Sequence, residues 1–454
     1  MTTRDFQFLV QEDDQARQTI TAQSLWMAGR DPSGNLQTSF VTYPGSNPVF
    51  IGPLNEDGSV YSDCLNDFYR VWNVRRAQIE FHISDFSDNG QIDNPIEDVI
   101  GWPGEGNDHF FDIYGFELPN STQLAPFLDL DSDGIYEPLD GEYPVEPVDQ
   151  SIPQYLSWEV HNTLLTDPIF SLEGSVSAEV HLTQWAYLCS DLDILNKTVF
   201  SRYEIINRGQ TSLEDFKVGI WTDFKLGCGV DDLVGCEPSR NTYFVYNASN
   251  IDGENCGNNS DFFGEDAPVQ SVSILNQPMN SFVAQMSFND DFPPELLRAC
   301  DAQEVFNNLN GLLIDGSPIT NVGLGNNENL GDTTLFHFNG DPNNPDEWSL
   351  STVGFSSLEQ WYGLASVDIG SWNQGEVITM DVANSFFREP GNNHLENVQA
   401  MYEGVDLLQN LYDSGWLQTC SPIECIDDCR WAGDLNNDGI ANYVDLVALG
   451  FGYN

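Results

Sequence analysis

The chain has 454 residues with 71 acidic and only 15 basic side chains, which gives a formal net charge of −56. This charge repels nucleic acid and anionic membrane surfaces, so neither is expected as a partner. It does not imply disorder, because only 19% of the residues are charged and the 12% that are aromatic suffice to build hydrophobic cores. Bound Ca²⁺ and a salt-adapted origin explain the acidity equally well.

No apolar segment is long enough for a transmembrane helix, so direct membrane insertion is not expected. The first residues, Met-Thr-Thr-Arg-Asp-Phe, lack the apolar core of a signal peptide. Since the remaining sequence has the features of a secreted chain, we expect an extracellular, cell-surface-associated protein whose leader is missing from this sequence.

The nine cysteines follow no tetrathiolate zinc spacing, which favours disulfides formed in an oxidising compartment. Cys228 and Cys236 are near enough in sequence to close a short loop, and Cys420, Cys425 and Cys429 cluster near the C-terminus. Because the count is odd, at least one thiol stays free or pairs between chains.

Residues 1–150 are rich in Gly, Pro, Asn and Asp and contain only short strand-like runs, such as residues 39–43. This composition predicts a loop-rich N-terminal region ordered by calcium and disulfides, with one helix over residues 71–83. Residues 85–96 have an incomplete cation-binding spacing that ends on Ile96, where a carboxylate is required. A capped turn explains that segment at least as well as a metal site.

A more complete calcium-loop spacing begins at Asp129, where the sequence reads D-L-D-S-D-G. Short acidic side chains on alternate positions, a glycine for the turn and later carboxylates are what a hard cation requires. The alternative is a solvated acidic turn. The predicted Ca²⁺ ligands are Asp129, Asp131, Asp133, the carbonyl of Ile135, Glu137 and Asp140.

From about residue 155 the apolar pattern changes to period two, which predicts β-strands separated by turns. We therefore expect a mainly β fold, with an antiparallel β-sandwich over residues 151–415. A helical segment over residues 295–313 interrupts it, and an amphipathic helix over residues 394–412 ends it. The predicted strands are residues 177–189, 198–206, 216–224, 241–246, 269–275, 281–288, 361–369 and 376–383.

The last segment, residues 416–454, reads as a Cys-rich linker followed by a second calcium loop, G-D-L-N-N-D-G-I-A-N-Y-V-D. It has oxygen-bearing side chains in register, a glycine at Gly439 and a closing carboxylate before an apolar run. A polar turn is the alternative. The predicted Ca²⁺ ligands are Asp434, Asn436, Asp438, the carbonyl of Ile440, Asn442 and Asp445.

Several segments, in order along the chain, resemble large secreted and cell-surface proteins of Bacteroidota that are exported by the type IX secretion system. The C-terminal loop resembles the calcium repeat of dockerins, which closes with Asp, but no second repeat follows it here. The resemblance also draws attention to Asp223, Asp231 and Asp232 as acids that could hold a cation or form a solvated loop. The matching segments are residues 52–54, 69–83, 88–93, 102–104, 124–144, 203–208, 221–247 and 431–439.

No catalytic motif is present: the six histidines show no H-E-x-x-H, and neither a G-x-S-x-G elbow nor a phosphate-binding loop occurs. The sequence therefore predicts a calcium-stabilised structural or adhesive protein of the bacterial surface, for example a filament subunit. Its partners would be further copies of itself or other surface proteins. Two alternatives stay open: a polysaccharide-binding protein or hydrolase, and a dockerin-bearing scaffold-docking protein.

Overall fold

The computed structural model describes residues 8–415, apart from 13–14, 41–49, 56, 62–66, 120–123, 164–173, 255, 257–261, 288–291, 327–329 and 355–359. The predicted C-terminal calcium loop, with Asp434, Asp438 and Asp445, lies outside the described residues, as do Cys64 and the three C-terminal cysteines.

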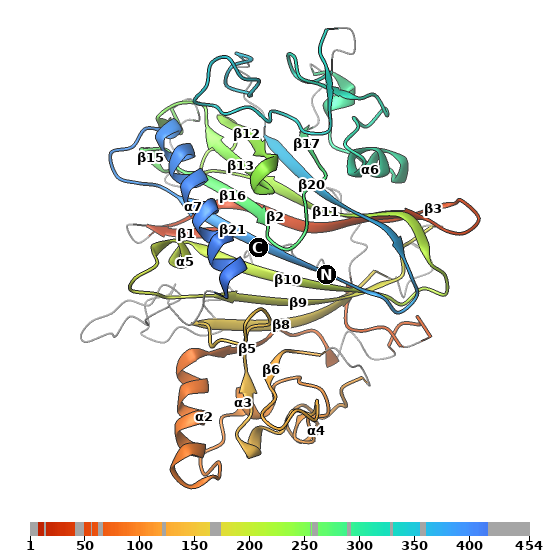
Figure 1. The fold of residues 1–454 in the computed structure, drawn as a ribbon, viewed down its shortest axis with the longest axis vertical. Helices are drawn as coiled ribbons and strands as arrows, with labels where there is room; N and C mark the ends of the chain where they lie inside the picture. The colour runs from red at the N-terminus through yellow and green to blue at the C-terminus, as the bar shows by residue number, and fades with distance from the viewer. Residues whose placement is uncertain are drawn as a thin grey trace.

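Two antiparallel sheets packed face to face form the body of the molecule (Figure 1). The six-stranded sheet contains, in spatial order, β1 (Phe8–Glu12), β2 (Gln15–Arg30), β11 (Leu213–Phe224), β20 (Trp361–Trp372) and β17 (Ser281–Met286), with β3 (Leu36–Ser39) also beside β2. The nine-stranded sheet contains β12 (Asp232–Glu237), β13 (Thr242–Asn247), β16 (Val269–Ile274), β21 (Val377–Phe387), β10 (Thr198–Asn207), β9 (Ala178–Ala186), β8 (Tyr155–Asn162) and β4 (Phe50–Ile51), with β5 (Trp72–Arg75) also beside β8.

The predicted mainly β, antiparallel, sandwich-like fold is confirmed for the described residues. The structure adds that residues 8–39, within the region expected to be loop-rich, supply β1, β2 and β3. In β2, Ile20 pairs with Phe224 and Ala28 with Lys217 of β11, so the N-terminal strand lies inside the six-stranded sheet. The two parts of the chain are therefore joined by backbone hydrogen bonds.

The helix expected over residues 71–83 is displaced. Trp72–Arg75 form β5, which pairs with β8, and helix α2 (Arg76–Asn89) begins only after this strand. Trp72 and Val74 are buried while Asn73 and Arg75 are half-buried, a period-two pattern that favours the strand over the helix.

Of the other two predicted helices, one is much shorter than expected and one is confirmed. Residues 295–313 form only a 3₁₀ turn (Pro294–Leu296) and the short helix α6 (Ala302–Leu309), which Asp301 caps by accepting the N–H of Glu304. The C-terminal helix is confirmed as α7 (His394–Ser414), and its buried face packs across β13, β16 and β21.

The space between the sheets contains a polar layer within an otherwise apolar core. The amides of Gln23 and Asn384 bond each other reciprocally, with N···O distances of 2.9 and 3.3 Å, although they lie in opposite sheets. The Thr19 hydroxyl donates to the side-chain amide oxygen of Gln270 at 2.9 Å across the same gap. These four side chains are at most 3% exposed, so the hydrogen bonds are fully desolvated and fix the register of one sheet against the other.

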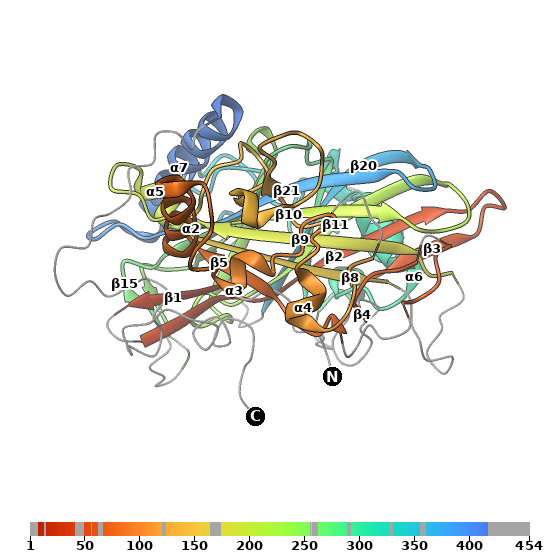
Figure 2. The same ribbon diagram turned by 90° about the horizontal axis from the view of Figure 1, so that it is seen from below.

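Two smaller regions cover the ends of the sandwich. Helices α2, α3 (Glu97–Ile100) and α4 (Phe110–Tyr114) lie at the β8 end, and they are nearest the viewer in Figure 2. Helix α6 lies at the opposite end in Figure 1. In the described part of the chain, no helix combines the length and apolarity needed to cross a membrane.

The disulfide pairing differs from the one considered from sequence. Cys228 is bonded to Cys256, whereas Cys236 is a free, buried thiol on β12 that contacts the carbonyl oxygen of His337 at 3.2 Å. Cys189 is also disulfide-bonded. A disulfide closing residues 228–236 was therefore the wrong choice, because Cys236 points into the core.

The Gln23–Asn384 pair can be tested by Asn384→Ala. Removing one amide leaves the buried Gln23 amide without its partner, so we expect a loss of about 2–3 kcal/mol in the free energy of unfolding. Urea denaturation measures it, with Gln399→Ala on the exposed face of α7 as the control, expected to change stability by less than about 0.5 kcal/mol. Equal effects of the two variants would contradict a structural role for the pair.

Candidate metal centre

The acidic segment that starts at Asp129 connects two short strands, β6 (Phe127–Leu128) and β7 (Tyr143–Pro144), which pair with each other. Asp129 accepts the N–H groups of Ser132 at 2.6 Å and Gly134 at 2.9 Å. Gly134 has φ of 81°, a left-handed conformation that glycine adopts without strain. The loop is thus folded by its own aspartates, as the spacing predicts.

The structure brings four of the five predicted side chains together. Ligand oxygens of Asp131, Asp133 and Glu137 all lie within 4.8 Å of one another. Oxygens of Asp129 and Asp131 form a second such group, and its third member is Glu142. Asp131 belongs to both groups, so the two sets of oxygens are contiguous.

Asp140 belongs to neither group. It ends the 3₁₀ helix η1 (Pro138–Asp140), which changes the path of the chain just before the expected closing position. Gly141, at φ of 97°, then reverses the backbone and brings in Glu142. A twelve-residue count assumes a regular loop. The carboxylate that groups with Asp129 and Asp131 is that of Glu142, two residues after the expected closing position.

Glu142 is the member of these carboxylate groups that the sequence did not predict. It is 2% exposed, and its two carboxylate oxygens accept the N–H groups of Leu130 and Glu137, each at 2.8 Å. Burial raises its pKa, while these two hydrogen bonds oppose that rise. The only sequence signal was a glutamate directly after a glycine and before an apolar strand.

His82 ties this centre to α2. Its Nε2 lies 3.1 Å from the carbonyl oxygen of Glu142, and the side chain is 1% exposed. Burial lowers the pKa of His82, so it donates as a neutral imidazole. This hydrogen bond links the position of Glu142 to that of α2, the helix at the β8 end of the sandwich.

The electrostatics of the loop favour a cation. The pKa of Glu137 is raised, first by desolvation and then by Asp133, Asp140 and Asp131. Within the described ranges, no Lys or Arg forms an ion pair with Asp129, Asp131, Asp133, Glu137 or Glu142. All the grouped donors are oxygens, the donor type that Ca²⁺ and Mg²⁺ prefer and zinc or copper do not require.

The incomplete loop at residues 85–96 is a helix end. Asp85 lies within α2 and accepts both the backbone and the side-chain N–H of Asn94, at 2.8 and 3.0 Å. The side chain of Asn89 donates to Asp93 at 2.7 Å. This network is the capped turn that the sequence left open.

No model of a known protein family matches the chain, and neither does any curated protein. The argument for a cation site therefore rests on the geometry of the acidic loop.

A second carboxylate pair lies in the turn after β7. Glu146 is fully buried and accepts the N–H groups of Val148 at 2.7 Å and Ser151 at 2.8 Å. Burial raises its pKa to about 8, and its interaction with the Asp149 side chain acts in the same direction. The raised pKa favours a protonated Glu146 at neutral pH.

Replacing the closing residue tests which carboxylate completes the acidic loop. Glu142→Gln should weaken Ca²⁺ binding at this loop about tenfold or more, because it removes the charge and one buried N–H acceptor. Asp140→Asn, two residues away, should have a much smaller effect. Isothermal titration calorimetry on both variants distinguishes them, and a larger effect of Asp140→Asn would favour the regular spacing.

The Glu146 pair predicts a pH-dependent stability. Its pKa is about 8 in the folded chain and about 4.3 when unfolded. Protonated Glu146 contributes fully to the free energy of unfolding below the pKa of the unfolded chain, and this contribution is lost as pH rises through the pKa of the folded chain. The slope is at most about 1.4 kcal/mol per pH unit. Glu146→Gln should flatten this slope, as measured by denaturation from acidic to alkaline pH. The exposed control Glu403→Gln should retain it.

Proposed function

We propose that this chain is an extracellular, calcium-stabilised structural or adhesive protein of the bacterial surface. The resemblance of its sequence to type IX-exported proteins of Bacteroidota supports the location, and the Cys228–Cys256 disulfide is compatible with an oxidising compartment. The observation that carries the proposal is the grouping of five carboxylates on the acidic loop, with Asp131 shared between the two sets.

Calcium would act through folding. An ion that binds only the folded loop adds about 2.7 kcal/mol when its free concentration is a hundred times the dissociation constant. Such loops bind weakly in extracellular modules, at dissociation constants of about 10⁻⁴–10⁻³ M, so they fill outside the cell. Through Glu142 and His82, occupancy would stabilise α2 as well as the loop.

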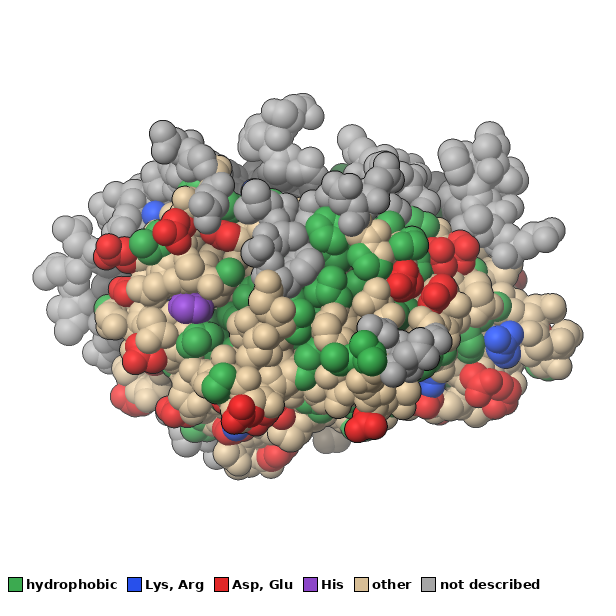
Figure 3. Space-filling model, turned by 90° about the horizontal axis from the view of Figure 1, so that it is seen from above, with side chains coloured by type: hydrophobic (Ala, Val, Ile, Leu, Met, Phe, Trp, Pro, Cys, Tyr) green, Lys and Arg blue, Asp and Glu red, His purple; other side chains and the backbone are tan. Residues whose placement is uncertain are grey.

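The surface charge fits a role that depends on cations. On the face in Figure 3, acidic side chains are scattered around the periphery and basic ones are few. Copies with a formal charge of −56 repel one another, so divalent cations would lower the barrier to assembly. Self-association and attachment to other surface proteins would both become calcium-dependent.

One observation favours the second candidate, an extracellular polysaccharide-binding protein. Tyr69, Phe81 and Phe111 are 45%, 48% and 48% exposed, and all three lie in the region that contains α2 to α4. Exposed rings can stack on sugar faces. If this candidate holds, replacing Tyr69 and Phe111 by Ala should abolish retention on a polysaccharide column without changing the melting temperature.

The principal test compares the full chain in calcium and in EGTA, by light scattering after size-exclusion chromatography and by thermal melting. We expect EGTA to lower the melting temperature and to dissociate any assembly. Asp131→Asn, which removes the shared ligand, should lower the melting temperature in calcium towards the EGTA value, whereas the exposed Asp346→Asn should not. Identical melting with and without calcium would rule out a stabilising role for the ion.

A further inference from the structure

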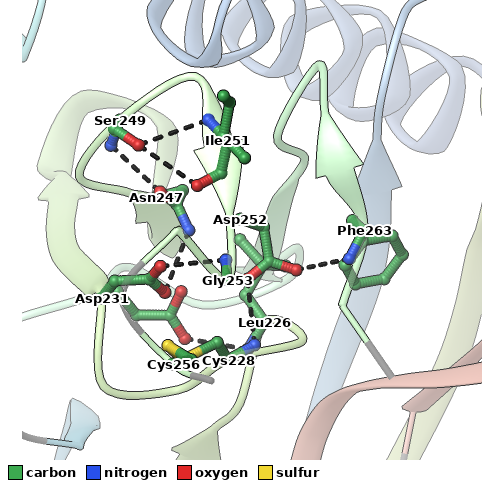
Figure 4. Close-up of a disulfide and its surroundings, with 11 residues drawn as sticks. Leu226, Cys228, Asp231, Asn247, Ser249, Ile251, Asp252, Gly253, Cys256 and Phe263 are labelled. Atoms are coloured by element: carbon green, nitrogen blue, oxygen red, sulfur yellow. Dashed lines mark hydrogen bonds between the residues drawn. A yellow bond between two sulfur atoms is a disulfide. The ribbon is translucent and has the colours of Figure 1, made fainter. Parts of the chain in front are cut away.

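A second group of acids converges beside the disulfide, apart from the acidic loop. Asp231 and Asp232 lie where the turn after β11 enters β12, and Asp252 lies in β14 (Ile251–Asp252), which pairs with β15 (Gly264–Glu265). The Cys228–Cys256 bond joins these two segments, and Figure 4 shows the Asp231 and Asp252 carboxylates on either side of this junction. Three aspartates from two cross-linked turns thus share one small region.

Backbone N–H groups hold two of these carboxylates in fixed positions. Asp231 accepts from Gly253 at 3.0 Å, and Asp252 accepts from Cys228 at 3.0 Å (Figure 4). The aspartate before β12 is thus bonded to the turn after β14, and the aspartate of β14 is bonded to the turn before β12. Asp231 also accepts from the side chain of Asn247 at 3.2 Å, and Asp252 accepts the N–H of Phe263 at 2.5 Å. Because a carboxylate has about four lone pairs, each retains acceptor capacity after its two bonds.

Asp232 is held differently and is incompletely satisfied. It is 2% exposed, and one oxygen accepts the N–H of Leu226 at 2.8 Å. Its other oxygen, Oδ1, is buried without any hydrogen-bond partner. A buried carboxylate oxygen without a partner is costly unless a proton or a cation satisfies it.

No basic side chain supplies that compensation. Of the described residues, no Lys or Arg forms an ion pair with Asp231, Asp232 or Asp252. Arg388, whose charge lowers the pKa of Asp252, donates to the carbonyl oxygens of Phe263 and Glu265. Burial, and then the neighbouring acids, raise the pKa of Asp232 well above its usual range and that of Asp252 to about 6.

We propose that Asp231, Asp232 and Asp252 form a further divalent-cation site, with the buried Oδ1 of Asp232 as its principal ligand. Ca²⁺ fits this site because every free donor is an oxygen, while the two nearby sulfur atoms are committed to the disulfide and cannot act as thiolates. Asp223, the third acid singled out from the sequence, is not part of it, because it lies on β11 and bonds Gln360.

The ligand shell needs more than these side chains. Three ligand oxygens lie within 4.8 Å of one another in each group of the acidic loop, a closeness that the three aspartates here do not reach. Water and main-chain carbonyl oxygens commonly complete calcium shells.

The experiment isolates this site from the calcium loops. In the full-length chain carrying Asp131→Asn and Asp438→Asn, equilibrium dialysis against millimolar ⁴⁵Ca²⁺ should still detect one bound ion per chain. Adding Asp232→Asn should weaken that binding about tenfold or more, whereas adding the exposed Asp346→Asn should not. Because the loop substitutions are present throughout, the result does not depend on whether the acidic loop binds calcium.

Two results would overturn the proposal. One is the absence of bound calcium in the loop-substituted chain, and the other is unchanged binding after Asp232→Asn. Either would mean that a proton alone satisfies Asp232. If Asp232→Asn does not fold, as judged by circular dichroism, Asp252→Asn is measured instead with the same expected loss.

Discussion

The neutralisation of crowded carboxylates is the constraint on which the rest of this structure depends. A buried charge without a partner costs several kcal/mol, and the chain has too few basic side chains to pair with all its acids. The described residues solve this locally in different ways. Asp381 has an arginine, Asp129 has backbone N–H groups, and burial raises the pKa of Glu146 so that protonation is favoured. For the groups around Asp131 and Asp232 we propose cations.

The arginines that are present join layers of the fold. Arg202 on β10 makes two 2.7 Å contacts with Asp381 on β21 and a third with the carbonyl oxygen of Pro147, in the turn after β7. Tyr412, near the end of α7, also bonds Asp381. The Arg202–Asp381 ion pair thus attaches both the turn after β7 and helix α7 to the nine-stranded sheet. Since Asp381 is 1% exposed, removing either charge would leave the other without compensation.

Glu179 plays the same part on β9. Its carboxylate bonds His181 at 2.9 Å and Arg208 at 2.9 Å, and it accepts the N–H of Leu54 at 2.6 Å. A Glu–His pair of this kind resembles catalytic machinery when seen in a sequence. Both side chains are 1% exposed. The hydrogen bonds of Glu179 to Leu54 and Arg208 attach the loops that carry those residues to β9.

Much of the sandwich could be predicted from sequence, because its strands alternate between apolar and polar residues and turns separate them. The amphipathic α7 was equally readable. The long strand β2 was not, because only long-range pairing with β11 distinguishes its sequence, Gln15–Arg30, from an irregular segment. Local pattern also failed at Trp72–Arg75, where pairing with β8 overrode an apparent helix.

At the acidic loop, the spacing identified Asp129, Asp131, Asp133 and Glu137, since neighbouring positions determine how these side chains group. It could not identify Glu142, whose place follows from a 3₁₀ turn and a glycine at positive φ. Nor could it identify Asp252, which is brought to Asp232 by a disulfide whose partner Cys256 is remote in sequence. Contacts between residues close in sequence can be predicted from their spacing, whereas contacts made by a turn of the chain or by a distant disulfide cannot.

The position of β2 has a consequence for how the chain folds. Its hydrogen-bonding partner β11 begins at Leu213, and β11 in turn needs β20, which ends at Trp372. β2 can pair with its sequence neighbours β1 and β3, but its edge towards β11 must stay unpaired until β11 has been synthesised, and such high contact order slows folding. An acidic chain that stays expanded by its own charge during this interval is protected from premature strand pairing. The net charge thus acts on the unfolded chain as well as on the folded one, because it keeps the nascent protein apart from its copies until the later strands have been made.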